Sequence, residues 1–405
     1  MYKILFVIID GVADHKIKEL GNKTPLEAAK KKNIDSLCKF SECGMLYPID
    51  IGIAPGSDTG HLSILGYDPI KDNPGRGVFE ALGEGIKLEK GDIAFRINFS
   101  TYLNGKIVDR RAGRNPKYID ELVDEFIEKL DIPYEFILKR TFEHRGIFVI
   151  KGKGEFSKNV TDTDPHKENA IPLECKAKDE NSKKLAEIIN YISKKFYEFS
   201  KDHKLNKKRV SEGLPPANYI LFRGAGEIKE IESFEEKYNL KACFIAGGSM
   251  YKGIARYLNI YCPDIPGANG TVNTSLFSKA ENAIKFRDKY DIVFVHIKAT
   301  DSLSHDKKPR EKKKFIEKID EIFFSRVKDE FDIILLTSDH TTSSIFGKHT
   351  ADPVPIMIYS SIADRKDPVK NFAERKCYRG ILGFLKGKYL MKILLNKIGK
   401  LDVLE

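Results

Sequence analysis

Three stretches of the chain are almost continuously apolar, and each is followed by an acidic residue. The run "KILFVIIDG" (3–11) leads to Asp10, "YDIVFVHIKATD" (290–301) leads to Asp301, and "FDIILLTSDH" (331–340) ends in Asp339 and His340. Runs of Val, Ile, Leu and Phe without polar alternation are typical of strands that are covered on both faces of a parallel sheet. We therefore predict three buried strands in a parallel sheet between helices.

Amphipathic patterns separate these strands. The segment "TPLEAAKKKNIDSLCKF" (24–40) begins with Thr24 and Pro25, a suitable N-cap and first helical residue. In "PREKKKFIEKIDEIFFSRVKDE" (309–330) the apolar residues are spaced to form one buried helix face. Alternating strands and helices predict a doubly wound α/β fold, in which ligands bind beyond the carboxyl ends of the strands.

The stretch from 71 to 242 has a different pattern. In "DIAFRINFSTYLNGKIVDRR" (92–111) two strand-like runs flank an Asn-Gly pair, which is typical of a tight hairpin. Further strand-like runs and one long amphipathic helix follow, at 145–154, 217–226 and 181–203. We therefore expect an α+β lid domain at 71–242, inserted in an α/β domain made of 1–70 and 243–405 and roofing its active site.

Composition narrows the class of protein. The 405 residues are 41% hydrophobic and 32% charged, and no apolar run approaches the length of a membrane span. The six cysteines form no CxxC pair, which fits a reducing cytosol and predicts a cytoplasmic location. The net charge of +10 lies partly in "KDHKLNKKR" and "DKKPREKKK", runs that are typical of solvated faces. No nucleic-acid-binding motif accompanies them, so a small anionic substrate is a better explanation for the charge.

The segment "IGIAPGSDTGHLSILGYDP" (51–69) permits two interpretations of Ser57. In one, Pro55 and Gly56 make a turn, and Ser57 or Asp58 is the N-cap of a helix. In the other, Ser57 is a nucleophile at a helix N-terminus, where the dipole and free N–H groups favour a phosphate. This segment by itself leaves both interpretations open.

Carboxylate and imidazole side chains accompany the strand ends in a pattern that suits divalent metal ions. Their number suits two groups. One consists of Asp301, His305 and His349, and the other of Asp10, Asp339 and His340 with the Ser57 oxygen. The four-residue spacing of Asp301 and His305 places both on one face of a helical turn. Two adjacent metals would support an in-line displacement and would activate a serine that lacks a histidine base.

These motifs carry a resemblance to a known family. In order, Asp10-Gly11, "APGSDTGH", "KATDSLSH", "SDH" and "KHTADPVP" resemble the alkaline phosphatase superfamily. With "NPGRGVFEALGEGIKLEKGDIAFRINFST", "VDRRAGR", "VTDTDPH" and "PPANYILFRGAG", nearly the whole chain resembles the cofactor-independent phosphoglycerate mutases of the archaeal type. Two motifs depart from the expected pattern: "TDSLSHD" lacks a Gly-His-Asp form, and "DHTTSS" lacks Ser-Thr-Pro after Asp-His.

The resemblance implies roles for particular residues. Ser57 would be transiently phosphorylated beside two divalent ions, drawn from Mn²⁺, Zn²⁺, Co²⁺ and Mg²⁺. A catalytic lysine is expected near the metals, with Lys252 as the first choice and Lys298 as the second. In the insert, the guanidinium groups of Arg111, Arg114 and Arg223 suit a carboxylate or phosphate. Asp164 and His166 could bind the glycerate hydroxyl or transfer its proton.

The resemblance implies an isomerase that interconverts 3-phosphoglycerate and 2-phosphoglycerate through a phosphoserine, independently of 2,3-bisphosphoglycerate. A metal-dependent phosphohydrolase and a mutase for another phosphorylated metabolite are the alternatives with the same core. A non-catalytic basic binding protein is an alternative from a different class, but it would not need the full ligand set. We expect a phosphoglycerate as the partner, with no nucleic acid or membrane, and we leave a homo-oligomer open.

Overall fold

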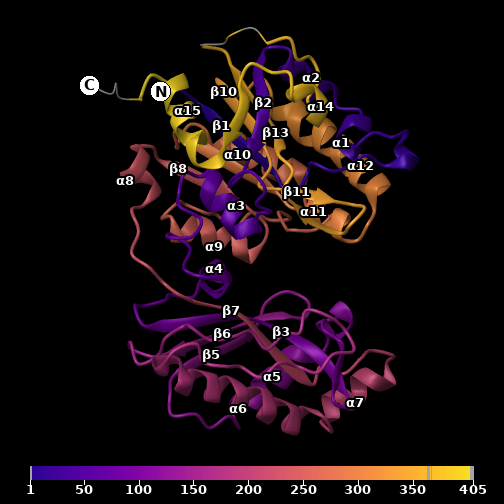
Figure 1. Ribbon diagram of the computed structural model, residues 1–405, viewed down its shortest axis with the longest axis vertical. Coiled ribbons are helices and arrows are strands. Elements are labelled where there is room, and N and C mark those ends of the chain that lie inside the picture. The colour runs from indigo at the N-terminus through magenta and orange to yellow at the C-terminus, as the bar shows by residue number, and fades with distance from the viewer. Residues whose placement is uncertain (1, 363–364, 366, 402–405) are drawn as a thin grey trace. The chain divides into compact units, whose positions relative to one another are not determined.

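The computed structural model describes residues 2–362, 365 and 367–401, and the chain divides into two compact units (Figure 1). The first unit comprises residues 1–73 and 231–405, and the second comprises residues 74–230. Helix α8 (Phe234–Tyr238) therefore belongs to the first unit, although we expected the insert to extend to residue 242. The expected domain edges stay a prediction, because a compact unit does not by itself define a domain border.

A seven-stranded sheet forms the centre of the first unit. Four neighbouring strands are mutually parallel, and one of the two inner strands among them, β1, is buried along its whole length. The next strand, β13, is antiparallel to both of its neighbours. In spatial order the strands are β14 (Gly383–Lys386), β2 (Ser41–Tyr47), β13 (Val354–Ser360), β10 (Ile333–Thr337), β1 (Ile4–Ile9), β9 (Ile292–Ile297) and β8 (Ala242–Ile245). The three strands predicted from apolar runs are β1, β9 and β10, which lie side by side.

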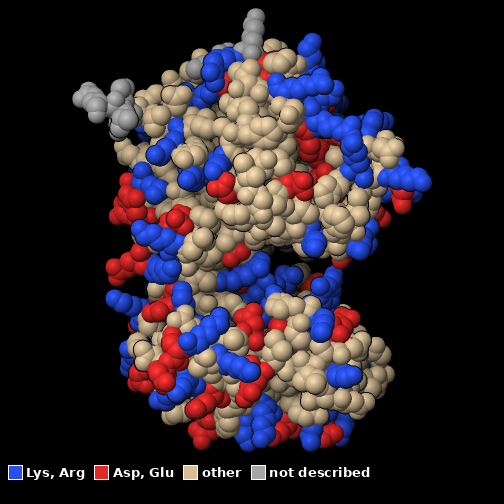
Figure 2. Space-filling view, viewed as in Figure 1, with Lys and Arg blue, Asp and Glu red and all other residues tan. Residues whose placement is uncertain are grey.

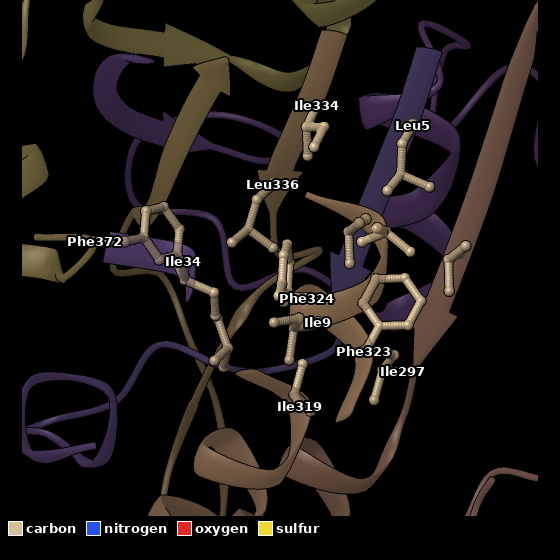
Figure 3. Packing of buried hydrophobic residues seen from close by; sticks show 14 of the residues in the cluster. Leu5, Ile9, Ile34, Ile297, Ile319, Phe323, Phe324, Ile334, Leu336 and Phe372 are labelled. Atoms are coloured by element: carbon tan, nitrogen blue, oxygen red, sulfur yellow. The ribbon is translucent and has the colours of Figure 1, made fainter. Parts of the chain in front are cut away.

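Helices cover both faces of this sheet, because its strands present apolar side chains to both sides. On one face Leu5, Ile297 and Leu336 belong to the same buried cluster as Phe323 and Phe324 (Figure 3). On the other face the Phe294 ring contacts Phe6 and Phe244 of the neighbouring strands and Phe234 of α8. This layered arrangement confirms the predicted doubly wound α/β fold.

The two predicted helices of this unit form, but each is interrupted. Thr24 caps α1 (Pro25–Ala28) in a reciprocal capping box with Glu27, and Ala29 then leaves the helical region before α2 (Lys32–Cys38). The second helix begins as α12 (Pro309–Lys318), continues as the π-helical segment η4 (Ile319–Phe324) and ends in α13 (Ser325–Val327). The wider π turn accompanies the burial of two consecutive side chains, Phe323 and Phe324.

The remaining elements of the first unit include those that follow the parallel strands. Helix α11 (Ala299–His305) begins two residues after β9, and a short hairpin of β11 (Thr341–Ser343) and β12 (Lys348–Thr350) follows β10. The others are η1 (Lys18–Leu20), α3 (Ser57–Ile64), α9 (Ser249–Tyr257), α10 (Leu276–Phe286), α14 (Glu374–Cys377), η5 (Gly387–Tyr389) and α15 (Leu390–Lys397).

The second unit is an α+β structure built on an antiparallel sheet. Its strands are β3 (Asp92–Leu103), β4 (Lys106–Asp109), β5 (Phe136–Arg140), β6 (Arg145–Lys151) and β7 (Tyr219–Glu227). The predicted hairpin forms at Asn104 and Gly105, which both have positive φ. The helical elements are α4 (Arg76–Gly83), η2 (Ala112–Arg114), α5 (Ile119–Ile127), η3 (Glu180–Ser182), α6 (Lys183–Ser200) and α7 (Lys204–Ser211).

Charged side chains of both signs are interspersed over the visible surface (Figure 2). Most members of the two basic runs are exposed, as expected of solvated faces, but each run contains one buried cation. Lys312 donates to Asp14 Oδ2 at 2.9 Å, and Arg209 donates to backbone carbonyl groups. No helix in the described part of the chain has the length and apolar character that crossing a membrane requires.

Candidate functional site

The acidic residues that follow the three central strands come together at one edge of the sheet. Asp10 directly follows β1, Asp301 lies in the first turn of α11 after β9, and Asp339 and His340 follow β10. Because these parallel strands are neighbours, their carboxyl ends meet at the same edge, where ligands bind in such folds. The β11–β12 hairpin returns the chain to this edge and brings in His349.

Asp301, His305 and His349 form one group of potential metal ligands. The Nε2 atoms of His305 and His349 lie 3.3 and 3.2 Å from Asp301 Oδ1, and 3.2 Å from each other. The Nδ1 atoms lie 2.8 Å from carbonyl oxygens, of Gly347 for His305 and of Pro55 for His349. Each Nδ1 therefore carries a proton, and in the neutral ring each Nε2 presents a lone pair to the group.

Asp10, Asp339 and His340 form a second, fully buried group, and Ser57 joins it. His340 Nε2 lies 3.4 Å from Asp10 Oδ1, 3.1 Å from Asp339 Oδ2 and 3.1 Å from Ser57 Oγ. Helix α3 begins at Ser57 itself, and Gly56 occupies the N-cap position. The interpretation of Ser57 as a helix cap is therefore wrong, and its hydroxyl faces the second group.

Lys298 lies between the two groups. Its Nζ is 3.2 Å from Asp10 Oδ2 and 2.5 Å from Asp301 Oδ2. Lys252, our first choice for a lysine near the metals, instead pairs with Asp264 at 2.5 Å. Of the two candidates, Lys298 is therefore the one that contacts the ligand groups, because it directly follows β9 at the carboxylate edge whereas Lys252 lies in α9.

The electrostatic balance keeps these groups charged. Burial raises the pKa of Asp301, but the charge of Lys298 and the close contacts with His305 and His349 outweigh burial and hold that pKa well below its ordinary value. Burial likewise lowers the pKa of Lys298, but Asp10 and Asp301 raise it well above its ordinary value. One lysine thus faces several buried carboxylates, and buried charges in excess of their partners are typical of metal sites.

Two buried histidines support the carboxylates and were not identified from the sequence. His296 Nε2 lies 2.9 Å from Asp10 Oδ2, and its ring stacks on Tyr251 with centroids 3.7 Å apart. Burial lowers the pKa of His296 to about 4 even though Asp10 opposes that shift, so the ring is neutral and donates Nε2–H. His61 Nδ1 donates to the backbone carbonyl of Ser57 at 2.7 Å and lies 3.3 Å from Asp339 Oδ2. A polar residue inside the otherwise apolar β9 was the signal that could have revealed His296.

In the second unit, Arg111 and Arg114 lie on a tightly constrained loop. Asp109 accepts from the backbone N–H groups of Arg111 and Gly113, both at 2.7 Å. The backbone is left-handed at Ala112, Gly113 and Arg114, with φ of 41°, 69° and 55°. Such a conformation is costly for alanine and arginine, and it is found most often at functional sites. Both arginines are exposed.

A buried arginine stabilises this loop through hydrogen bonds to its backbone. Arg209 donates to the carbonyl oxygens of Ala112 at 2.9 Å, Asn115 at 3.0 Å and Pro215 at 3.0 Å. Its guanidinium group is therefore used entirely inside the unit. The basic run at 201–209 thus contains a structural residue that its charge alone did not reveal.

Asp164 is buried and binds two arginines. Its carboxylate accepts from Arg110 Nε at 2.7 Å and Nη2 at 2.6 Å, and lies 3.4 Å from Arg223 Nη1. Burial raises the pKa of Asp164, but the Arg110 hydrogen bonds outweigh it, so that pKa is below its ordinary value. We expected Asp164 to bind a hydroxyl or to transfer a proton, and its pairing favours the orientation of arginines instead. The exposed His166 donates its backbone N–H to Asp164 at 2.9 Å.

The buried His144 lies among arginines. Burial lowers its pKa, and Arg145, Arg111, Arg96 and Arg114 lower it further, to about 2. Several guanidinium groups are therefore near one another in the second unit. Such a concentration of donors suits an anion with several oxygen atoms, such as a carboxylate or phosphate.

Comparisons with known proteins agree with this architecture. Residues 39–206 match the family profile of 2,3-bisphosphoglycerate-independent phosphoglycerate mutase. The mutase of that name from Methanopyrus kandleri is 40% identical over 412 residues, which cover 99% of this chain and 97% of that protein. Mutase 1 from Methanocaldococcus jannaschii is 42% identical, with 98% of each chain covered.

Two solved structures share the fold over the full length. The PH0037 protein from Pyrococcus horikoshii superposes with a TM-score of 0.86 at 35% identity, over 100% of this chain and 99% of that one. The cofactor-independent phosphoglycerate mutase from Thermoplasma acidophilum superposes with a TM-score of 0.68 at 35% identity, over 98% of this chain and 99% of that one.

The fold and the site define an α/β enzyme with clustered acidic and histidine side chains at the carboxyl edge of its sheet. The relatives narrow this class, since they match almost the entire length of the chain. The chain belongs to the family of 2,3-bisphosphoglycerate-independent phosphoglycerate mutases, and it is therefore an isomerase. The resemblance recognised in the sequence motifs is confirmed.

Proposed function

We propose that this isomerase interconverts 3-phosphoglycerate and 2-phosphoglycerate by passing the phosphoryl group through Ser57. The substrate gives its phosphoryl group to Ser57 Oγ, and the glycerate that remains is reoriented and takes the group back on its other hydroxyl. The observation that carries this proposal is the position of Ser57, buried at the first residue of α3 with Oγ 3.1 Å from His340 Nε2.

Two divalent metal ions fit the chemistry of the ligand groups. In the first group two imidazole nitrogens and a carboxylate oxygen lie within 3.3 Å of one another. Each ring donates its Nδ1–H to a backbone carbonyl group. The second group offers two carboxylates, an imidazole and the Ser57 hydroxyl. When bound, such ions polarise phosphoryl oxygens and lower the pKa of a coordinated hydroxyl. Mn²⁺, Zn²⁺, Co²⁺ and Mg²⁺ are the candidates.

The chain's own residues prepare Ser57 for attack. The hydroxyl lies 3.1 Å from His340 Nε2, and a cation held by His340, Asp10 and Asp339 would lower the pKa of that hydroxyl and so favour the loss of its proton. Ser57 is the first residue of α3, and the N-terminus of a helix favours a phosphoryl group. Lys298 balances the charge between Asp10 and Asp301 and holds both carboxylates in place.

The second unit supplies candidate substrate-binding residues. Arg111 and Arg114 are presented by a strained loop, and Arg223 is oriented by Asp164. Guanidinium groups bind carboxylate and phosphate oxygens in pairs, so these arginines suit both ends of a phosphoglycerate. His166 is exposed, donates its backbone N–H to Asp164 and stays a candidate for contact with the glycerate hydroxyl.

All six cysteines are free thiols, which supports our proposal of a cytoplasmic location.

A product assay tests the proposal. Metal-stripped enzyme is given 3-phosphoglycerate without 2,3-bisphosphoglycerate, and Mn²⁺ is then added. We expect 2-phosphoglycerate to form only after the addition and to remain the main product. Free phosphate as the main product would favour the hydrolase alternative, and turnover only with other phosphate esters would favour a different mutase. No turnover of any ester by metal-loaded enzyme would favour a binding protein.

A further inference from the structure

A threonine hydroxyl connects the two ligand groups. Thr342, at the centre of β11, is fully buried, and its Oγ1 lies 2.8 Å from Asp301 Oδ1 and 2.9 Å from His340 Nδ1. Asp301 belongs to the first group and His340 to the second. This threonine lies in the "DHTTSS" motif, which departs from the Ser-Thr-Pro form expected after Asp-His.

The direction of these two hydrogen bonds follows from the number of protons. A carboxylate that binds a metal ion is deprotonated and can only accept hydrogen bonds, so Thr342 donates its single hydroxyl proton to Asp301. The hydroxyl oxygen can then only accept from His340, which places a proton on His340 Nδ1. A neutral His340 therefore has no proton on its other ring nitrogen, Nε2. This nitrogen faces Ser57, Asp10 and Asp339 with its lone pair.

The surrounding backbone fixes the Thr342 side chain. Its N–H donates to Ala13 O at 3.1 Å, and it pairs with His349 in the β11–β12 hairpin. A side chain at Gly11 would collide with the Thr342 hydroxyl, so the glycine after Asp10 leaves the space that this hydroxyl occupies. The hydroxyl is thus held where it can contact both groups at once.

We propose that Thr342 is a positioning residue that fixes the tautomer of His340 and couples the two metal sites. The inference rests on the proposed two-metal centre. Residues that donate to or accept from metal ligands in this way orient the ligands, and their loss costs about 10- to 100-fold in metal affinity. The hydroxyl, rather than the volume of the side chain, is the feature that matters.

Three substitutions test this role. Thr342→Val keeps the shape and removes the hydroxyl, whereas Thr342→Ser keeps the hydroxyl. Thr337→Val is a matched control, because Thr337 is also buried but donates to the backbone carbonyl of Pro355 at 3.1 Å. Each metal-stripped protein is titrated with Co²⁺ by calorimetry and by visible absorption, which reports the ligand geometry. Circular dichroism checks the fold, and Thr342→Ala replaces the valine variant if that variant does not fold.

We expect wild type, Thr342→Ser and Thr337→Val to bind two Co²⁺ with similar affinity and similar spectra. Thr342→Val is expected to bind at least one Co²⁺ about 10- to 100-fold more weakly, with an altered spectrum. If Thr342→Val binds Co²⁺ as tightly as wild type, or if Thr342→Ser binds it as weakly as Thr342→Val, the proposed role of the hydroxyl is wrong. The two-metal centre would not be contradicted by either result. Failure of the wild-type protein to bind Co²⁺ would overturn the two-metal centre and this inference with it.

Discussion

At the scale of single residues, position in the fold decides which of several similar side chains enters the site. Lys252 follows "GGSMY" and Lys298 follows the apolar run "DIVFVHI", and neither pattern shows which lysine contacts the carboxylates. Lys298 is the residue after β9, so its Nζ reaches Asp10 and Asp301. His296 was hidden for a related reason, since its apolar neighbours in β9 made it resemble a core residue. Spacing along the chain does not report such contacts between strands.

Arg114 offers a test at this scale of the proposed grip on glycerate. Positioning of this kind can contribute roughly 7–11 kcal/mol to a transfer step. With Arg114→Ala we expect slower isomerisation and more free phosphate per isomerisation, because glycerate escapes and water accepts the phosphoryl group from Ser57. Added glycerate is expected to suppress part of this release. Both products are measured in one reaction.

Arg140→Ala is the control for this prediction, because Arg140 pairs with Asp120 on the same unit and lies outside the arginine loop. We expect its ratio of phosphate to 2-phosphoglycerate to equal that of wild type. If Arg114→Ala lowers the rate but leaves this ratio unchanged, Arg114 does not retain glycerate.

At the scale of elements, apolar periodicity predicted the strands well and helix continuity poorly. The continuous runs predicted β1, β9 and β10 because burial on both faces demands apolar residues at every position. The helix expected at 24–40 is broken at Ala29, although alanine is a strong helix former, because tertiary packing overrides local propensity. The strand β5 (Phe136–Arg140) was not predicted, because its apolar side chains are only three consecutive residues, Phe136 to Leu138, and two cations follow them.

The start of β6 carries a prediction about pH. His144 has a folded-state pKa of about 2 against an ordinary 6.5, because it is buried among arginines. Below pH 6.5 the unfolded chain therefore binds a proton that the folded chain does not, and stability falls as the pH falls. We expect His144→Gln to reduce this dependence by up to about 1.4 kcal/mol per pH unit between pH 6.5 and 5. Urea unfolding at several pH values measures it, and an unchanged slope would contradict the burial of a neutral His144.

At the scale of the whole molecule, the two units carry different parts of the chemistry. The first unit assembles Ser57 and both ligand groups at one sheet edge, and the second unit gathers arginines around a strained loop. The sequence predicted the ligand groups because several carboxylate and imidazole side chains together at the ends of parallel strands suit divalent metal ions. It could not predict that Asp164 pairs with Arg110, because that contact joins residues 54 positions apart on separate loops.

The central claim is that the phosphoryl group passes through Ser57, and one measurement tests it most directly. Metal-loaded enzyme is mixed with 3-phosphoglycerate, quenched in acid within one turnover, digested and examined by mass spectrometry. We predict one phosphoryl group on the peptide that contains Ser57, and neither this group nor isomerisation in Ser57→Ala. Isomerisation at the normal rate by Ser57→Ala, or by wild type without any phosphorylated Ser57, would contradict the account.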